Sequence, residues 1–160
     1  MPTHFRRIHA MTLDFPGHGY SERVTTSTYS LRRYADLVAG FLTALEIGQA
    51  VVVGNSMGGA VALQLAIRHP QRVARLVVVD AATGSEDTRR PPAALMRLLT
   101  AGPLGRAFIY YTFGNPAFAR RGLEFSYADP ARLSDRSFTS YRAPLRVRGT
   151  AQALVAMNTS

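Results

Sequence analysis

The first half of the chain alternates between strand-like and helix-like patterns of hydrophobic and polar positions. A short, mostly apolar run over Ile8–Asp14 ends in a Pro/Gly turn and predicts a strand. Apolar residues then recur at helical spacing over Leu31–Leu45, and Ser30 stands before them as a good N-cap. We therefore expect a strand followed by a helix that Gly48 closes.

Two compact runs of β-branched residues, Ala50–Gly54 and Val73–Asp80, flank a helical pattern over Met57–Arg68. The helical pattern stops at His69 and Pro70 because proline cannot continue a helix. Continuous apolar strands are typical of parallel sheets that are buried on both faces. The order strand, helix, strand, helix, strand with short links therefore predicts an α/β fold with right-handed crossovers.

The second half of the chain has a different character. Strand patterns disappear after Gly84, and prolines break the remainder into short helices and loops. Nine of the 15 aromatic residues lie between Phe108 and Tyr141, in what we expect to be a helical segment. The sequence thus predicts two parts, a sheet-building core over residues 1–84 and a helical segment over residues 85–160.

Composition narrows the chemistry. The 160 residues are 47% hydrophobic, which is enough apolar material for one ordinary globular domain. The chain has no cysteine, which excludes disulfide scaffolds, zinc fingers and thiol nucleophiles. All 19 residues of the Lys and Arg class are arginine, and the absence of lysine excludes the phosphate-loop lysine, Schiff-base chemistry and Ser-Lys dyads. The remaining chemistry rests on Ser, His, carboxylates and Arg, and we expect no metal and no cofactor.

The net charge of +9 does not by itself indicate a nucleic-acid partner. The arginines are scattered as single residues and pairs, such as Arg89-Arg90 and Arg120-Arg121, and an electrostatic footprint needs clustering on one face. We therefore expect no nucleic-acid partner. No window approaches the length of a membrane span, and residues 1–10 lack the apolar core of a signal peptide. We expect a cytoplasmic protein without a membrane span, and the sequence leaves its oligomeric state open.

The most informative motif is Gly54-Asn55-Ser56-Met57-Gly58, which Gly59 follows at once. A G-x-S-x-G pentapeptide occurs by chance, but here it joins a strand to a small-residue helix, which is the setting of a nucleophile elbow. In that turn the serine is strained, and its neighbours lack bulk because strand and helix backbones crowd them. Ser56 also stands at a helix N-terminus, where the dipole and the Met57 amide stabilise an oxyanion. The alternative is a serine that only caps the helix.

Three segments resemble the α/β-hydrolase superfamily in order and register. They are Asp14-Phe15-Pro16-Gly17-His18-Gly19-Tyr20-Ser21, Gly54-Asn55-Ser56-Met57-Gly58-Gly59 and Arg75-Leu76-Val77-Val78-Val79-Asp80-Ala81-Ala82. The resemblance covers most of residues 8–84, and the Pro-rich tail resembles the family's cap domain more loosely. The serine motif is similar to that of meta-cleavage-product carbon–carbon hydrolases, esterases and lipases. The resemblance implies Ser56 as the nucleophile and the Met57 amide as half of the oxyanion hole.

Other parts of the family's machinery have no counterpart in this sequence. The family's catalytic histidine and usual acid follow the cap, and the loop that gives the second oxyanion amide follows its third strand. We therefore expect an internal fragment of such a hydrolase. The third strand normally lies between the fourth and fifth, so Ile8–Asp14 must pair directly with Ala50–Gly54 or stay detached. We expect a three-stranded remnant sheet of marginal stability.

Residues that replace the missing partners must lie at the serine's edge of the sheet. His69 stands 13 residues beyond Ser56 along a helix, roughly 20 Å away, and His9 lies about 17 Å from that edge. His18 alone occupies a loop at that edge, but the resemblance does not give the loop histidine the role of general base. Asp80 ends the next strand, where some relatives recruit their acid, although a turn-capping carboxylate is the plainer interpretation.

The aromatic residues of the helical segment bear on the substrate. Phe108, Tyr111 and Phe113 are candidates for a pocket that binds an apolar or aromatic ester or ketone, although most aromatic residues form core. Two hypotheses follow. The first is a Ser56-dependent hydrolase that cleaves an ester or carbon–carbon bond of a small apolar substrate. The second is a catalytically inactive fragment that serves as an interaction or scaffold piece.

Overall fold

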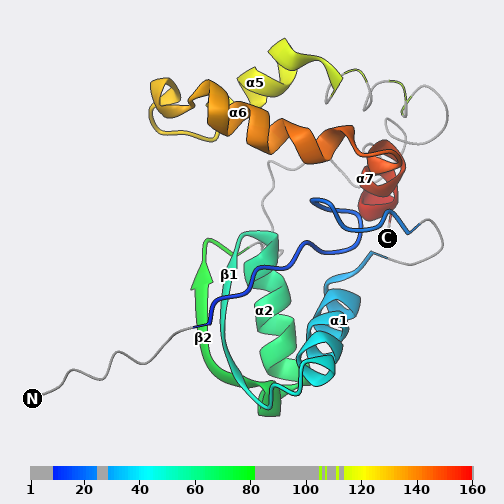
Figure 1. The fold of residues 1–160 in the computed structure, drawn as a ribbon, viewed down its shortest axis with the longest axis vertical. Helices are drawn as coiled ribbons and strands as arrows, with labels where there is room; N and C mark the ends of the chain where they lie inside the picture. Colours follow the sequence, from blue (N-terminus) through cyan, green and yellow to red (C-terminus); the bar gives the residue numbers. More distant parts are fainter. Residues whose placement is uncertain are drawn as a thin grey trace, which may run out of the picture.

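The computed structural model describes residues 9–24, 29–81 and 114–159, together with the isolated positions 105, 107 and 111. The described elements, shown in Figure 1, are α1 (Leu31–Ala44), β1 (Ala50–Asn55), α2 (Met57–Arg68), η1 (Pro70–Arg72), β2 (Val73–Val79), α5 (Pro116–Glu124), η2 (Pro130–Arg132), α6 (Asp135–Arg142), η3 (Ala143–Arg146) and α7 (Thr150–Thr159), where η marks a short 3₁₀ helix. Among these residues, no helix is long and apolar enough to cross a membrane.

β1 and β2 pair in parallel, and α2 connects them (Figure 1). The register places Val53 beside Val77 and Asn55 beside Val79. α2 packs against both strands, and α1 packs against α2. A parallel pair joined by a helix is the unit from which α/β folds are built, so the predicted fold class is confirmed.

The helix bounds follow from local signals in the sequence. α1 begins after Ser30, whose hydroxyl accepts a hydrogen bond from the amide of Arg33 at 3.3 Å. α2 ends at Arg68, and His69 is its C-cap residue, immediately before Pro70. These positions agree with the predicted helices to within one residue.

The core lies between α1, α2 and the loop that precedes α1, and α7 closes it. Its buried side chains are Tyr29, Tyr34, Ala35, Ala39, Val61, Leu65 and Ala153. Phe15, Met57 and Met157 are partly buried against it. The C-terminal helix therefore shares one core with the helix that follows Ser56.

The strand predicted over Ile8–Asp14 is wrong for the part that the structure describes. Residues 9–14 are exposed and form no strand, and the sheet among the described residues has two strands rather than three. A strand exists only where a neighbour offers backbone groups in register. Residues 9–14 have no such neighbour in the described part of the chain, so the run stays detached.

The expectation that both strands are buried on both faces is also wrong. Val51 and Val53 are 59% and 67% exposed, and Val77 and Val79 are about half exposed. Side chains alternate along a strand, and these four share the face that α2 does not cover. The apolar pattern shows that the strands are suited to burial, whereas burial itself requires a second layer on that face.

Candidate nucleophile elbow

Ser56 occupies a sharp turn between β1 and α2. Its backbone angles are φ 52° and ψ −119°, a combination that residues with a side chain rarely adopt and that costs about 1–3 kcal/mol. Its amide donates to the carbonyl oxygen of Val79 at 3.0 Å, and its carbonyl oxygen accepts from the amide of Ala60 at 3.2 Å. Strand pairing on one side and the first helical hydrogen bond on the other therefore hold the strained conformation.

Ser56 is exposed, and its hydroxyl makes no capping hydrogen bond to the helix. A serine that only caps α2 bonds to an amide two or three residues further on, so the capping interpretation is wrong. The amides of Met57, Gly58 and Gly59 have no acceptor inside the helix because they belong to its first turn. The turn therefore presents a hydroxyl next to N–H groups that have no acceptor within α2, at the positive end of a helix dipole.

The glycines around Ser56 are not equivalent. A β-carbon on Gly54 would lie 2.3 Å from the carbonyl oxygen of Gly58, and one on Gly59 would lie 2.8 Å from the β-carbon of Ala81. A β-carbon on Gly58 would meet nothing within 4 Å. The predicted crowding by strand and helix backbones is therefore correct at Gly54, and Gly59 packs against the residue after Asp80, but Gly58 is free of crowding.

Asp80 leaves β2 beside the point where Ser56 leaves β1. The two strands are parallel and Asn55 pairs with Val79, so Ser56 and Asp80 are the next residues at the same edge of the sheet. Asp80 is exposed and has a φ of 44°, a conformation that Asp tolerates better than most residues. Within the described residues its carboxylate has no hydrogen-bond partner, and its role as the acid stays a prediction.

His69 lies at the opposite end of α2 from Ser56. It is the C-cap residue of the helix, and its Nε2 lies 2.7 Å from Oδ1 of Asp36, which also pairs with Arg68 at 3.0 Å. His9 is exposed on the detached run. Among the described histidines, none hydrogen-bonds to Ser56, which agrees with the exclusion of His9 and His69 from sequence spacing.

His18 lies in the loop of residues 14–24, and one of its ring nitrogens is buried. Nδ1 has no hydrogen-bond partner among the described residues, and the ring packs edge-on against Tyr34 with 6.0 Å between centroids. Burial lowers the pKa of His18, and the Arg23 charge lowers it further, against the opposing effects of the Pro16 backbone and Asp14. The neutral imidazole is therefore favoured in the fold.

The loop of residues 14–24 is held by contacts within the loop and by contacts with Tyr34 of α1. The Asp14 carboxylate accepts from the amide of Tyr20 at 3.0 Å, and a β-carbon on Gly19 would lie 2.0 Å from that carboxylate. From α1, the ring of Tyr34 stacks on Phe15 at 4.7 Å, and its hydroxyl donates to the Pro16 carbonyl at 3.0 Å. Burial of the Tyr34 hydroxyl raises its pKa to about 12.

Arg23 is a residue of this region that the sequence pattern did not single out. Its guanidinium donates to the loop and to the C-terminal segment at once, through the oxygens of His18, Gly19, Ser21, Pro144 and Thr150. Pro144 and Thr150 lie 121 and 127 residues further along the chain. No local pattern reveals partners at such a separation.

Of the three predicted substrate-contacting aromatics, Phe108 and Phe113 lie outside the described residues. Tyr111 is described and is 66% exposed. Its backbone carbonyl accepts from the amide of Asn115, just before α5. Its role in substrate binding stays a prediction.

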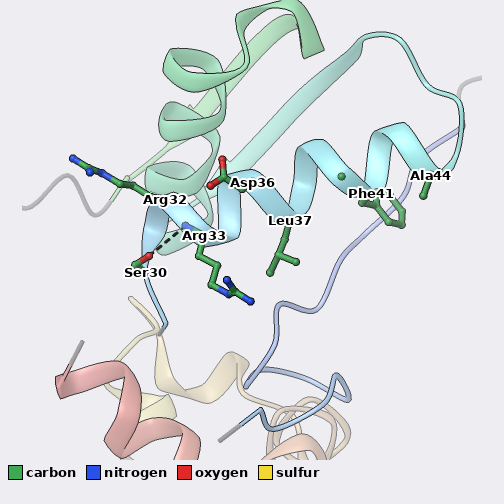
Figure 2. Close-up of a pocket in the computed structure, with 8 residues that line it drawn as sticks. Ser30, Arg32, Arg33, Asp36, Leu37, Phe41 and Ala44 are labelled. Carbon is green, nitrogen blue, oxygen red and sulfur yellow. Dashed lines mark hydrogen bonds between the residues drawn. The ribbon is translucent and has the colours of Figure 1, made fainter. Parts of the chain in front are cut away.

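A cavity of about 710 Å³ opens along α1 rather than beside Ser56 (Figure 2). Figure 2 shows Arg33 and Leu37 pointing to one side of the helix, whereas Asp36 points to the other side, where it meets Arg68 and His69. The lining residues are Ser30, Arg32, Arg33, Asp36, Leu37, Gly40, Phe41 and Ala44. None of them belongs to the turn that carries Ser56, so this cavity adds nothing to that site.

A family model described as alpha/beta hydrolase fold matches residues 5–158. The chain is 48% identical over 82 residues to 2-hydroxymuconate semialdehyde hydrolase from Pseudomonas sp. (strain CF600), in an alignment that covers 51% of this chain and 29% of the relative. It is 40% identical over 81 residues to 2-hydroxy-6-oxo-2,4-heptadienoate hydrolase from Pseudomonas putida, again over 51% of this chain and 29% of the relative.

Among solved structures, the chain is similar to the wild-type Cfl2 protein from Burkholderia cenocepacia, with a TM-score of 0.74 and 23% identity. The superposition covers 91% of this chain and 51% of that chain. The chain therefore spans about half the length of this solved relative, and its alignments span less than a third of the two curated relatives.

Proposed function

Because the chain belongs to the alpha/beta hydrolase fold family, we propose that it carries the nucleophile of a serine hydrolase that cleaves an ester or carbon–carbon bond beside a carbonyl group. The observation that carries the proposal is the strained, exposed Ser56 between β1 and α2. Strain of this kind persists where the surroundings over-determine it and is concentrated at functional sites.

In the proposed reaction, Ser56 Oγ attacks the carbonyl carbon of the substrate and its proton passes to a general base. The negative charge that develops on the carbonyl oxygen is stabilised by the Met57 amide at the N-terminus of α2. Collapse of the intermediate breaks the bond to the leaving group, which takes up the proton from the base, and leaves an acyl-serine that water then hydrolyses to the acid and free Ser56. Asp80 is the proposed acid partner of the base, a histidine that the family resemblance places after the cap.

The proposed substrate class is small apolar carbonyl compounds. The two Pseudomonas relatives are named as hydrolases of 2-hydroxymuconate semialdehyde and of 2-hydroxy-6-oxo-2,4-heptadienoate, and these names support a small carbonyl compound. The apolar character is proposed from the aromatic residues between Phe108 and Tyr141. We assign residues 85–160 to a cap over the site, with Tyr111 and its aromatic neighbours Phe108 and Phe113 as the substrate-facing side chains.

A fluorophosphonate probe tests the proposal directly. We expect one adduct on the intact chain, located by trypsin digestion to the peptide Tyr34–Arg68, whose only serine is Ser56. S56A abolishes the adduct, and S126A, which removes an exposed serine outside the site, retains it. Labelling of S56A at the wild-type rate contradicts the proposal.

The second candidate is a catalytically inactive piece that acts through interactions. It is favoured by one observation: within the described residues, no histidine hydrogen-bonds to Ser56, and a serine without its base loses most of its activation. The same probe separates the two candidates. A folded chain that acquires no adduct supports the inactive piece.

A further inference from the structure

One guanidinium joins two parts of the chain that are far apart in sequence. In the loop of residues 14–24, Arg23 donates to the backbone oxygens of His18 at 3.1 Å and Gly19 at 2.7 Å, and also to that of Ser21. Towards the C-terminal segment it donates to Pro144 at 3.1 Å and to the Thr150 hydroxyl at 3.1 and 3.2 Å. Among the described residues no carboxylate pairs with it, so neutral oxygens on both sides satisfy the charge.

The C-terminal side of this contact is shaped around Arg23. Thr150 is 6% exposed, and its hydroxyl donates to the Val147 carbonyl at 2.7 Å while it accepts from Arg23. Gly149 has a φ of 90°, which favours glycine, and a β-carbon there would lie 3.0 Å from the β-carbon of Arg23. The positive φ of Gly149, its close contact with Arg23 and the hydrogen bonds of Thr150 therefore all fix the contact between Arg23 and residues 149–150, which we call the junction.

α7 and the residue that follows Ser56 adjoin the same buried cluster. Thr150 is the first residue of α7, and Ala153, one turn later, is buried in the core cluster that Met57 packs against. The methyl carbon of Met157 lies 2.4 Å from the position that a β-carbon on Gly17 would occupy. Figure 1 shows α7, in red, beside the blue loop. The position of α7 thus bears on the residue that follows Ser56.

We infer that Arg23 is a positioning residue of the proposed hydrolase, which fixes α7 against the loop and against the buried cluster that Met57 also adjoins, and so limits the size of the acyl group that reaches Ser56. The inference rests on the proposed function for its effect on Ser56, but not for the placement of α7. A planar fork of five donors is required to hold both sides at once, and a lysine ammonium cannot reproduce it.

The placement of α7 is tested by trypsin, independently of any reaction at Ser56. Arg146 and Arg148 are exposed beside the junction, and cleavage there tracks local opening. We expect trypsin to cleave R23M and R23K at these sites at least about fivefold faster than the wild type. T150V is expected to show a smaller increase in the same rate. R33M, which changes an exposed arginine on α1, keeps the wild-type rate. Unchanged cleavage in R23M and T150V overturns the inference.

The effect on Ser56 is tested with a small and a bulky fluorophosphonate, well below the unfolding temperature of each variant. We expect the bulky-to-small ratio of labelling rates to rise about threefold or more in R23M and T150V, with little change in the rate for the small probe. A purely structural role lowers both rates together and leaves the ratio unchanged, which overturns the size limit.

The two tests separate the failure of this inference from the failure of the proposed function. A wild-type chain that neither probe labels overturns the proposed function, and with it the size limit at Ser56. The trypsin result then still decides whether Arg23 fixes α7. If R23M does not fold, T150V carries both tests because it leaves the bonds of Arg23 to the loop in place.

Discussion

Gly54 and Gly58 approach so closely that a β-carbon on Gly54 would lie 2.3 Å from the carbonyl oxygen of Gly58. The obstructing atoms are backbone atoms of α2, which cannot move without shifting the helix. On Gly58 itself a β-carbon meets nothing. The turn that holds Ser56 therefore depends on one of the two motif glycines far more than on the other.

The first prediction is a contrast between two alanine substitutions. G54A is expected to destabilise the fold by about 3 kcal/mol because it overpacks a rigid strand–helix contact. G58A is expected to be neutral or to stabilise by up to about 1 kcal/mol, since alanine favours the helix more than glycine does. Urea unfolding of both variants measures this, and equal destabilisation contradicts the contrast.

A second prediction concerns the face of the sheet that α2 does not cover. Val53 is 67% exposed and Val61 is 2% exposed, although both are valines in the motif-bearing half of the chain. V53T is expected to change the free energy of unfolding by less than about 0.5 kcal/mol and to reduce aggregation in light scattering, because it removes an exposed apolar group from the uncovered face of the sheet. V61T is expected to cost about 1–3 kcal/mol because it replaces a buried methyl group with a hydroxyl inside the core. Similar losses in the two variants mean that the face is covered.

The helices and the serine turn were predictable from the sequence because their causes are local. Ser30 caps α1, Pro70 stops the helix after His69, and the small residues around Ser56 permit the tight turn. Each signal lies within a few residues of the feature that it specifies. The α/β order followed from these elements, since a helix between two apolar strands makes them parallel.

What the sequence did not predict depends on distant partners. The run before Asp14 has strand-forming residues, but its described part has no neighbouring strand. Val51 and Val53 have the composition of buried strand residues, but burial depends on what covers them. Arg23 acts through oxygens 121 and 127 residues away. A hydrophobic pattern reports what a segment can pack against, not whether a partner is present.

A third prediction concerns the pH dependence of stability through His18. Burial lowers the pKa of His18 in the fold, while in the unfolded chain the pKa of His18 is about 6.5. Between the lowered folded pKa and that value the unfolded state binds more protons, so stability rises with pH across this window and is lost as pH falls through it. Urea unfolding between about pH 5 and 7.5 is expected to show a smaller slope for H18Q. The exposed His9 offers the control H9Q, and an H18Q slope equal to that of H9Q contradicts the prediction.

A fourth prediction concerns the acid limb of the stability profile. The hydrogen bond from Arg68, followed by that from His69, lowers the pKa of Asp36 in the fold. The stabilisation of the fold by ionised Asp36 is fully present above the pKa of the unfolded state, about 3.9. It is lost as pH falls through the lowered pKa of the folded state. D36N is expected to be less stable than the wild type at pH 7, with the difference shrinking towards pH 2. A difference that is constant with pH contradicts the assignment of the effect to the carboxylate.

The turn at Ser56 places the serine hydroxyl beside the Met57 amide, which has no acceptor within α2. The most direct measurement is a crystal structure of the chain after reaction with a fluorophosphonate. We expect a bond from Ser56 Oγ to phosphorus, with the phosphoryl oxygen at about 2.7–3.1 Å from the amide nitrogen of Met57. Phosphorus on another side chain, or an adduct on Ser56 whose oxygen points away from the Met57 amide, contradicts it.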